Sequence, residues 1–388
     1  EVMRGNVELG GLTKLLAKQT GFKHWVFTNS GRSALSVTLM ALGVLRPGRD
    51  EVIIPAYTSY SVPAAVVRAG FRVRLCDVEM ETLGLSPKEL ERVITSRTLC
   101  VVPAHLYGIP CRIQAVREIA DDHEIPVVED AAQAMGIRCN GDLGKKSLQA
   151  TIFSLSRGKT VPAAGGGLVG TNNPDLAEQC LRMLKSMYWE SNNVSGIGLA
   201  TALETSLMAL FIRPSLYWLP ASLPFLKLGT SIYDPGFKIA LISRFQEALA
   251  VRLLPGLEEL QDARKANANR LALALAELKS VCSICPREGE TCAPLRLPSL
   301  IQDHNMRNKL LAELQARGLG ATGGYPSPLS EISALKPHLA GSPVELHAAK
   351  HVSQHLVLLP THPWVRERDI EAIVKVFQQC IRQATPLR

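Results

Sequence analysis

The chain has 388 residues, of which 46% are apolar and 20% are charged. This length and composition allow a buried core and more than one domain, and we expect two domains that share one function. The net charge of +8 does not indicate a nucleic-acid-binding protein, because the 43 Lys and Arg residues are spread among 35 acidic residues. Such a charge fits a site for phosphorylated or anionic ligands. The nine cysteines are scattered and no apolar leader opens the sequence, so free thiols in a reducing cytoplasm are expected.

Short apolar runs rich in Val, Ile and Leu alternate with segments of helical period in the first half of the chain. The runs that we predict as strands are residues 25–27, 52–54, 73–78, 99–102, 127–128, 151–154 and 168–169. Strands that alternate with helices form a mostly parallel sheet, in which ligands bind beyond the carboxyl ends of the strands. Polar residues directly after each run are therefore candidate site residues.

The first motif, residues 28–34, lies between a predicted strand and a predicted helix. A glycine at such a turn, here Gly31, lets backbone amides approach an anion, and the helix dipole favours a phosphate there. Asn-Ser-Gly is also an ordinary turn in which Ser30 caps the helix. This motif alone leaves both interpretations open.

The second motif is a buried strand that ends in two carboxylates, Glu129 and Asp130, with Gln133 three residues later. A carboxylate at that end can pair with a protonated ring nitrogen and turn a pyridine into an electron sink, and Asp130 is our candidate. By the two-residue period of a strand, Glu129 points to the other face, where a structural partner is expected. Gln133 could hydrogen-bond a ring hydroxyl.

The third motif places Lys159 in a loop after a predicted strand, with the hydroxyls of Ser154 and Ser156 behind it and three glycines, residues 165–167, ahead. A lysine in such a crowded loop suits a Schiff base with a cofactor. Most lysines are solvated surface residues, so Lys159 by itself proves little.

An apolar insertion, at about residues 190–235, follows the predicted sheet. Charged residues and prolines interrupt it, so a continuous membrane-spanning helix is not expected. Its aromatic and Leu-rich piece, residues 211–225, could be buried against protein or lie in a membrane interface. Both readings stay open.

The second half of the chain predicts helices at residues 237–254 and 257–278, divided by Pro255 and Gly256, and a last helix at 367–381 that docks on a core. Cys282, Cys285 and Cys292 lie close together in sequence, but no fourth ligand follows at zinc spacing. We therefore expect no metal.

The three motifs, together and in this order, resemble those of the DegT/DnrJ/EryC1/StrS family of sugar aminotransferases, pyridoxal 5'-phosphate (PLP) enzymes of aspartate-aminotransferase fold type I. The matching stretches are residues 30–35, 47–55, 103–108, 128–133, 153–159 and 359–363. The resemblance covers nearly the whole chain outside the insertion. It implies a large PLP-binding α/β domain over residues 1–236, with a mostly parallel central sheet and helices on both faces, followed by linking helices and a small α+β domain over 237–388.

The resemblance also implies roles for the motif residues. Lys159 would form the internal aldimine and shuttle the proton, Asp130 would pair with the pyridine nitrogen, and Gln133 would lie beside the phenolic oxygen. Asp130 then keeps the ring cationic, so that the carbanion formed on proton loss is delocalised. Lys159, once displaced by the substrate amine, can take that proton from one carbon and return it to another.

The phosphate would be held by Ser154 and the backbone amides of Gly31 and Arg32. The family usually has Thr where this chain has Arg32, whose guanidinium could itself reach the phosphate. The family's ring-stacking aromatic residue is also absent, because Ser59 occupies its place. Tyr57 is the candidate ring partner and the nearby Tyr60 is an alternative, although each could equally be a core residue.

The pocket across the expected homodimer departs most from the family pattern. Relatives have a Tyr-Asn-Tyr-Arg segment that reaches the neighbouring subunit's phosphate, whereas this chain has residues 237–240, Phe-Lys-Ile-Ala, in which Lys238 could replace the Asn. On the substrate side, His105 and Tyr107 are the candidates.

The leading hypothesis is an aminotransferase that moves an amino group from glutamate or a similar donor to a keto sugar, most plausibly a nucleotide-linked one. One alternative is transamination of a lipid-linked or hydrophobic carbonyl at a membrane surface, with residues 211–225 making peripheral contact. A second alternative is a noncatalytic regulator that reuses the fold. Retention of four residues together argues for the enzyme: Lys159, Asp130, Gln133 and Ser154.

Overall fold

The computed structural model describes residues 6–136, 147–189, 232–287, 289–290, 292–341 and 345–384. Most of the predicted apolar insertion, including residues 211–225, lies outside these residues, so its two interpretations stay predictions. No helix in the described part of the chain is long and apolar enough to span a bilayer.

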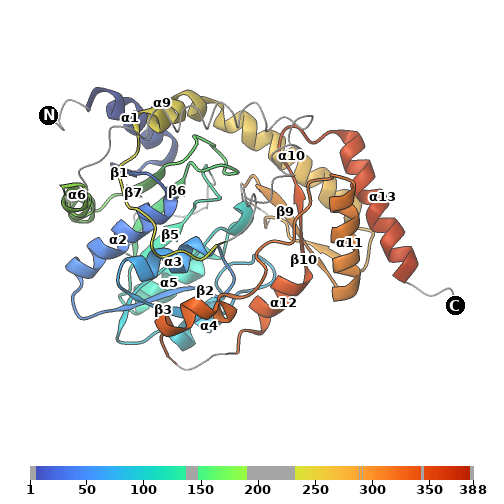
Figure 1. The fold of residues 1–388 in the computed structure, drawn as a ribbon, viewed down its shortest axis with the longest axis horizontal. Coiled ribbons are helices and arrows are strands. Elements are labelled where there is room, and N and C mark those ends of the chain that lie inside the picture. The colour runs from blue at the N-terminus through green and yellow to red at the C-terminus, as the bar shows by residue number, and fades with distance from the viewer. Residues whose placement is uncertain are drawn as a thin grey trace.

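The larger of two sheets has seven strands in the order β1-β7-β6-β5-β4-β2-β3 (Figure 1). The strands are β1 (His24–Thr28), β2 (Glu51–Pro55), β3 (Arg72–Cys76), β4 (Thr98–Val101), β5 (Val127–Asp130), β6 (Leu148–Ser154) and β7 (Gly167–Thr171). Pairing is parallel from β6 through β5, β4 and β2 to β3, whereas β7 is antiparallel to both β6 and β1. This sheet confirms the predicted α/β class, and its strands lie where the apolar runs predicted them.

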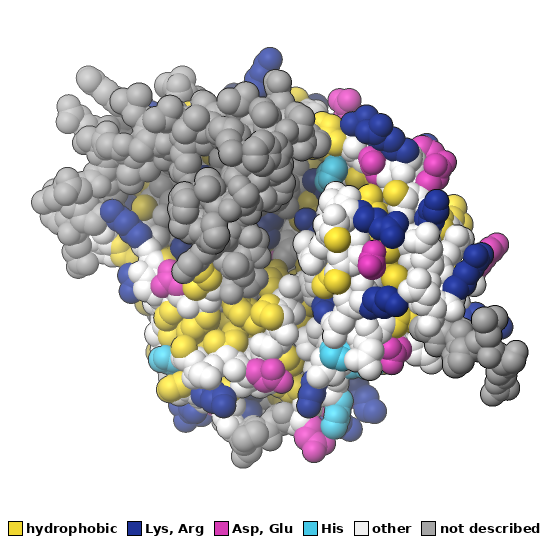
Figure 2. Space-filling view, turned by 45° about the vertical axis from the view of Figure 1, so that its right-hand side comes forward, with side chains coloured by type: hydrophobic (Ala, Val, Ile, Leu, Met, Phe, Trp, Pro, Cys, Tyr) yellow, Lys and Arg dark blue, Asp and Glu magenta, His cyan; other side chains and the backbone are white. Residues whose placement is uncertain are grey.

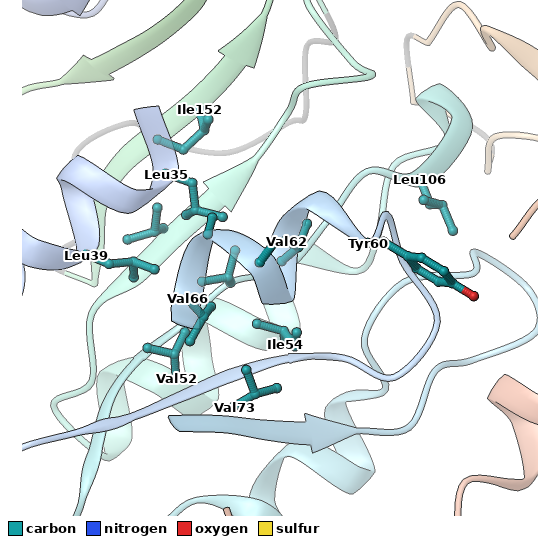
Figure 3. Close-up of a cluster of buried hydrophobic side chains, with 14 of the residues drawn as sticks. Leu35, Leu39, Val52, Ile54, Tyr60, Val62, Val66, Val73, Leu106 and Ile152 are labelled. Carbon is teal, nitrogen blue, oxygen red and sulfur yellow. The ribbon is translucent and has the colours of Figure 1, made fainter. Parts of the chain in front are cut away.

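Helices cover both faces of this sheet. They are α1 (Asn6–Thr20), α2 (Gly31–Leu45), α3 (Ser61–Arg68), α4 (Pro87–Val93), α5 (Ile113–Asp122) and α6 (Pro174–Trp189). Val52 and Ile54 of β2 pack into the cluster that α2 and α3 cover, whereas Ile53 between them packs with α4 and α5. This alternation is the two-residue period of a strand with both faces buried. Figure 3 shows the α2 and α3 side, where Leu35, Leu39, Val62 and Val66 meet the strand residues.

The rest of the described chain builds a smaller three-stranded sheet in the order β10-β9-β8, with antiparallel pairing. The elements of this C-terminal part are α9 (Arg244–Leu253), η4 (Leu254–Gly256), α10 (Leu257–Leu275), β8 (Val281–Ser283), β9 (Arg296–Ile301), α11 (His304–Ala316), η5 (Leu329–Glu331), η6 (Ser333–His338), α12 (His347–His355), β10 (Leu356–Pro360) and α13 (Glu367–Ala384). The predicted break at Pro255 and Gly256 is confirmed as the short η4 turn. The predicted docking face of the last helix is confirmed too, because Ile370, Ile373 and Phe377 are buried in the core of this part.

Helix α10 connects the two sheets, running in Figure 1 from α9 beside the large sheet to the small sheet. Helix α9 packs against α1, so the link is fixed to the large sheet at its start. The proposed domain boundary near residue 236 falls just before this link and stays a prediction.

Charge is distributed over the surface. On the face shown in Figure 2, Lys and Arg side chains are scattered over the C-terminal part and acidic side chains lie between them.

Candidate active site

The first and third motifs meet at the start of α2. Ser30 caps this helix, since its Oγ accepts a hydrogen bond of 3.3 Å from the Ser33 amide. A Cβ added to Gly31 would lie 3.0 Å from Cβ and 3.2 Å from Oγ of Ser154, the last residue of β6. Only glycine lets the serine approach so closely, and the first amides of a helix have no acceptor within it. The buried Ser154 hydroxyl and the α2 N-terminus therefore form a compact candidate site for an anion.

The sequence left two interpretations of this turn open, a helix cap at Ser30 and an anion site at Gly31, and the structure has room for both. Ser30 accepts from the Ser33 amide, whereas Ser154 approaches the turn at Gly31.

Asp130 ends β5 at the carboxyl edge of the sheet. Its Oδ1 accepts a hydrogen bond of 2.9 Å from the Ala132 amide, and its own amide donates to Pro103 O at 2.8 Å. Burial raises the pKa of the Asp130 carboxyl, and the Ala132 amide and Lys159 partly offset this rise. The carboxylate is thus fixed in position at low local polarity, where a cationic partner would stabilise its charge.

Lys159 lies in the loop after β6, and its amide donates to Ser156 O at 3.2 Å. Burial lowers the pKa of the Lys159 amine, and the charge of Asp130 offsets part of that effect. The mutual influence of the two groups places them within electrostatic reach of each other. A lysine with a lowered pKa has a larger neutral fraction, and the neutral amine is the nucleophilic form.

Glu129 and His105 belong to a buried polar network on the α5 side of the sheet. Glu129 accepts hydrogen bonds from Arg117 at 2.9 Å and from Thr151 at 3.5 Å, and it contacts His105 Nε2 at 2.5 Å. The amide of Cys111 donates to His105 Nδ1 at 3.2 Å. The predicted structural partnership of Glu129 is confirmed. Both ring nitrogens of His105 are engaged within this network, so neither is open to a substrate.

Four tyrosines gather between the large sheet and the C-terminal part. Tyr325 stacks on Tyr60 and on Tyr107, with ring centroids 6.0 Å apart in both pairs, and meets the edge of Tyr57 at 5.8 Å. Tyr57 is fully buried, and its hydroxyl accepts from the Tyr325 amide at 3.0 Å. Figure 3 shows the Tyr60 ring extending out of the aliphatic cluster with its hydroxyl pointing away from it.

Gln133 joins this tyrosine cluster to the turn after β5. Its Oε1 accepts from the Tyr107 amide at 3.0 Å, and its Nε2 donates to the Tyr325 hydroxyl at 3.2 Å. Sequence reasoning identified Gln133 and Tyr107 but missed Tyr325, which comes from a distant loop with no recognised motif.

The backbone at Tyr107 and Gly108 is in the left-handed region, with φ of 56° and 83°. This conformation costs about 1–3 kcal/mol for a residue other than glycine and occurs preferentially at functional sites. A Cβ on Gly108 would lie 3.0 Å from Leu295 N and 3.1 Å from Gln133 O, so a glycine is required where these segments meet. The strained turn brings Tyr107 to Gln133.

Arg32 and Lys238 lie at the outer side of the α2 turn. The Arg32 guanidinium is 4.5 Å from the Phe237 ring centroid, and its Nη1 is 3.6 Å from Oδ2 of Asp234. Lys238 is exposed, and its carbonyl accepts from Asn29 Nδ2 at 3.0 Å. The structure thus brings both residues to the edge of the anion site, with Arg32 held by Asp234 and Phe237.

The described residues contain no group of three His, Cys, Asp or Glu side chains arranged to hold a metal ion. Cys282 and Cys285 are exposed, whereas Cys292 is buried.

Comparison with known proteins gives one family. The model of the DegT/DnrJ/EryC1/StrS aminotransferase family matches residues 8–378. GDP-perosamine synthase from Caulobacter vibrioides is 28% identical over 370 residues, which cover 95% of this chain and 88% of that protein. A pleiotropic regulatory protein from Geobacillus stearothermophilus is 36% identical over 186 residues, which cover 46% of this chain and 50% of that protein.

Among solved structures, S. venezuelae DesV is 26% identical and superposes with a TM-score of 0.74, covering 96% of this chain and 89% of that one. The match to the family model extends from α1 into α13 and includes all three motifs. The chain therefore belongs to the DegT/DnrJ/EryC1/StrS aminotransferase family and is a PLP-dependent aminotransferase.

Proposed function

We propose that this aminotransferase moves an amino group from glutamate or a similar donor to the ketone of a nucleotide-linked sugar. The observation that carries the proposal is the position of Lys159, half-buried in the loop after the strand that ends at Ser154, where the charge of Asp130 acts on its amine. The similarity to GDP-perosamine synthase, whose name includes a nucleotide-linked sugar, supports the substrate class.

The residues present fit PLP at each of its polar groups. Gly31 leaves open the space that a Cβ would fill beside the Ser154 hydroxyl, which suits a phosphate at the α2 N-terminus. The Asp130 carboxylate, fixed by the Ala132 amide, suits the ring nitrogen. The Gln133 amide, which Tyr107 and Tyr325 orient, suits the phenolic oxygen.

We assign the covalent and proton-transfer roles to Lys159. PLP, when bound, supplies an electron sink for the negative charge that develops as the substrate carbon loses its proton. Burial lowers the pKa of Lys159 and so favours the neutral Nζ, the form that can hold the cofactor and, once released, take up the substrate proton. The same Nζ returns this proton at the neighbouring carbon.

Asp130 and Gln133 would set the electronic state of the ring. A carboxylate at the sheet edge favours the protonated ring nitrogen, since an opposite charge at short range stabilises the cation. Gln133 can donate its second Nε2 hydrogen to the phenolic oxygen while the first is held by Tyr325.

A homodimer is part of the proposal. Lys238 is exposed beside the α2 turn, where relatives present a segment to the neighbouring subunit, so we propose that it contacts the phosphate site across the dimer. Sedimentation equilibrium would test this, because a monomer at working concentrations would exclude such a contribution.

The test combines a spectrum with product formation. The purified protein with PLP should absorb near 420 nm, roughly as the protonated cofactor bound to a lysine does. Glutamate should shift this band and release 2-oxoglutarate, and a panel of nucleotide-linked keto sugars should restore the band. A wild-type protein without the band, or with a band that no amino donor shifts, would refute the enzyme.

Membership of the aminotransferase family argues against the noncatalytic regulator, although a pleiotropic regulatory protein is 36% identical over about half the chain. The other alternative, a different substrate, has its own supporting observation. The Leu-rich sequence of residues 211–225 favours a hydrophobic carbonyl at a membrane surface. Co-sedimentation with liposomes, compared between the intact chain and a variant lacking residues 211–225, tests this membrane alternative. If the two proteins sediment equally, the alternative is excluded.

A further inference from the structure

Three basic side chains gather where α10, the start of β9 and the loop after β10 meet. Arg264 of α10 donates from Nη1 to Leu295 O at 3.1 Å, directly before Arg296. One turn further along α10, Asn267 donates to His362 O at 3.0 Å. These bonds hold Arg264, Arg296 and His362 on three different segments at one place.

Within this basic cluster, neither Arg264 nor His362 forms an ion pair with any residue that the structure describes. Burial, and then the charge of Arg296, lowers the pKa of Arg264 to about 10. Burial and both arginines lower the pKa of His362, and Asp369 alone among the charged neighbours raises it.

Two nitrogens in the cluster are buried without a hydrogen-bond partner, Nε of Arg264 and Nδ1 of His362. Buried polar atoms in native proteins almost always have a partner, so such atoms indicate a ligand or an ordered water. The Arg264 edge that carries Nε and Nη2 is the edge with which arginine binds a carboxylate or phosphate through two parallel hydrogen bonds. Since Nη1 donates to Leu295 O, Arg264 is held in place while its buried Nε has no hydrogen-bond partner.

The basic cluster borders the candidate cofactor site. Leu295, whose carbonyl holds Arg264, donates its amide to Tyr107 O at 2.8 Å. Tyr107 in turn donates to the Gln133 side chain. A short chain of hydrogen bonds therefore leads from Arg264 to the residue assigned to the phenolic oxygen.

We propose that Arg264, together with Arg296 and His362, binds an anionic group of a substrate, a carboxylate or a phosphate. The inference rests on the proposed function, in which both substrates are anionic: the amino donor carries carboxylates and a nucleotide-linked sugar carries phosphates. Arg264 makes the two-point contact, the neighbouring positive charge of Arg296 adds electrostatic attraction, and His362 offers Nδ1 as a hydrogen-bond donor.

Calorimetric titration of the PLP-loaded protein tests the proposal with two unreactive probes, glutarate and inorganic pyrophosphate. Glutarate has carboxylates but no amino group, and pyrophosphate stands for the nucleotide-linked substrate. One of the two should bind saturably, and its identity assigns the site to the donor or to the sugar substrate. Arg264→Gln should raise the Kd of that probe by about tenfold or more, because a charge-assisted two-point contact is lost.

Arg270→Gln is the matched control. Arg270 lies on the same helix with a 58% exposed side chain in an ion pair with Glu367, so its removal changes the net charge equally but should leave the Kd unchanged. Arg264→Lys keeps the charge and loses the planar edge, and should still weaken binding. If Arg264→Gln fails to retain the cofactor, His362→Gln carries the test and should raise the Kd several-fold.

Absence of saturable binding of either anion to the wild type, or equal Kd values for wild type, Arg264 and His362 variants, would overturn the proposal. The probes do not react, so this result is independent of amino transfer. If the protein binds an anion through Arg264 but never releases 2-oxoglutarate, the anion site is supported and the proposed function is contradicted.

Discussion

The amide of Gln133 and the phenol of Tyr325 are joined by a 3.2 Å hydrogen bond, although the two residues lie 192 positions apart in the chain. Gln133 belongs to the turn after β5 and Tyr325 to the loop after α11. The bond therefore connects the C-terminal part of the molecule to the candidate cofactor site. It fixes the amide that we assign to the phenolic oxygen, and it can be removed without changing the shape of the ring.

Tyr325→Phe should weaken PLP binding while leaving the fold intact. The substitution keeps the stacking on Tyr60 and Tyr107 but removes the hydrogen bond from Gln133, worth about 0.5–1.5 kcal/mol, so the Kd should rise roughly two- to tenfold. Absorbance titration with PLP measures it. Tyr60→Phe is the control, because the Tyr60 hydroxyl lies 3.1 Å from Ser327 Oγ and makes no bond to Gln133. Equal Kd values for the two variants would remove the positioning role of Tyr325.

Gly31→Ala should disturb the phosphate site. The new Cβ would be 3.0 Å from Ser154 Cβ, so either the serine or the start of α2 must move, at a cost of about 1–3 kcal/mol. PLP affinity should fall by about tenfold or more. Gly256→Ala, at a position with open space around it, should leave the affinity unchanged. Unchanged PLP affinity in Gly31→Ala would show that this turn does not bind the phosphate.

Asp130→Asn should slow amino transfer more than it weakens cofactor binding. An amide can still accept from the Ala132 amide, but it cannot favour a protonated ring nitrogen. Loss of this preorganised charge should lower kcat by about a hundredfold or more. Single-turnover kinetics with glutamate would measure the effect, and a variant with wild-type rates would contradict the role given to Asp130.

Glu129→Gln should lower the stability of the fold and not act on the chemistry directly. Burial raises the pKa of Glu129, but His105 and Arg117 more than offset it, so the carboxylate is ionised and its removal leaves Arg117 buried without a counter-charge. The expected loss in the free energy of unfolding is about 3 kcal/mol or more, measured with urea. Glu178→Gln, in the exposed pair with Arg182, should change it by less than about 0.5 kcal/mol.

The same carboxylate predicts a pH dependence. Because the folded pKa of Glu129 lies below its unfolded value, the stability it contributes is present above about pH 4.3 and is lost as the pH falls through the folded pKa. The free energy of unfolding should therefore drop more steeply in acid for the wild type than for Glu129→Gln. Parallel curves would contradict this.

Much of the large sheet could be predicted from the sequence because its signals are local. Each strand is a short apolar run, and the two-residue period alone predicted a structural partner for Glu129, which Arg117 of α5 provides. The cap at Ser30 and the break at Pro255 follow from nearest neighbours in the same way.

The remaining features depend on contacts between distant segments, which no local pattern encodes. Tyr325 and Arg264 lie in unremarkable sequence and gain their surroundings only when the C-terminal part folds onto the sheet. His105 follows a strand as a site residue would, yet its ring turns to Glu129 and to the Cys111 amide. Strand order, and with it the antiparallel β7, is equally nonlocal.

The central claim is that Lys159 holds the cofactor. Borohydride reduction of the PLP-loaded protein, followed by digestion and peptide mass measurement, tests it most directly, because reduction makes a cofactor–lysine bond permanent. We predict a pyridoxyl-phosphate mass on the peptide that contains Lys159, and none when glutamate is added before the reduction. Label on another lysine, or an unlabelled Lys159 peptide from a yellow protein, would contradict the account.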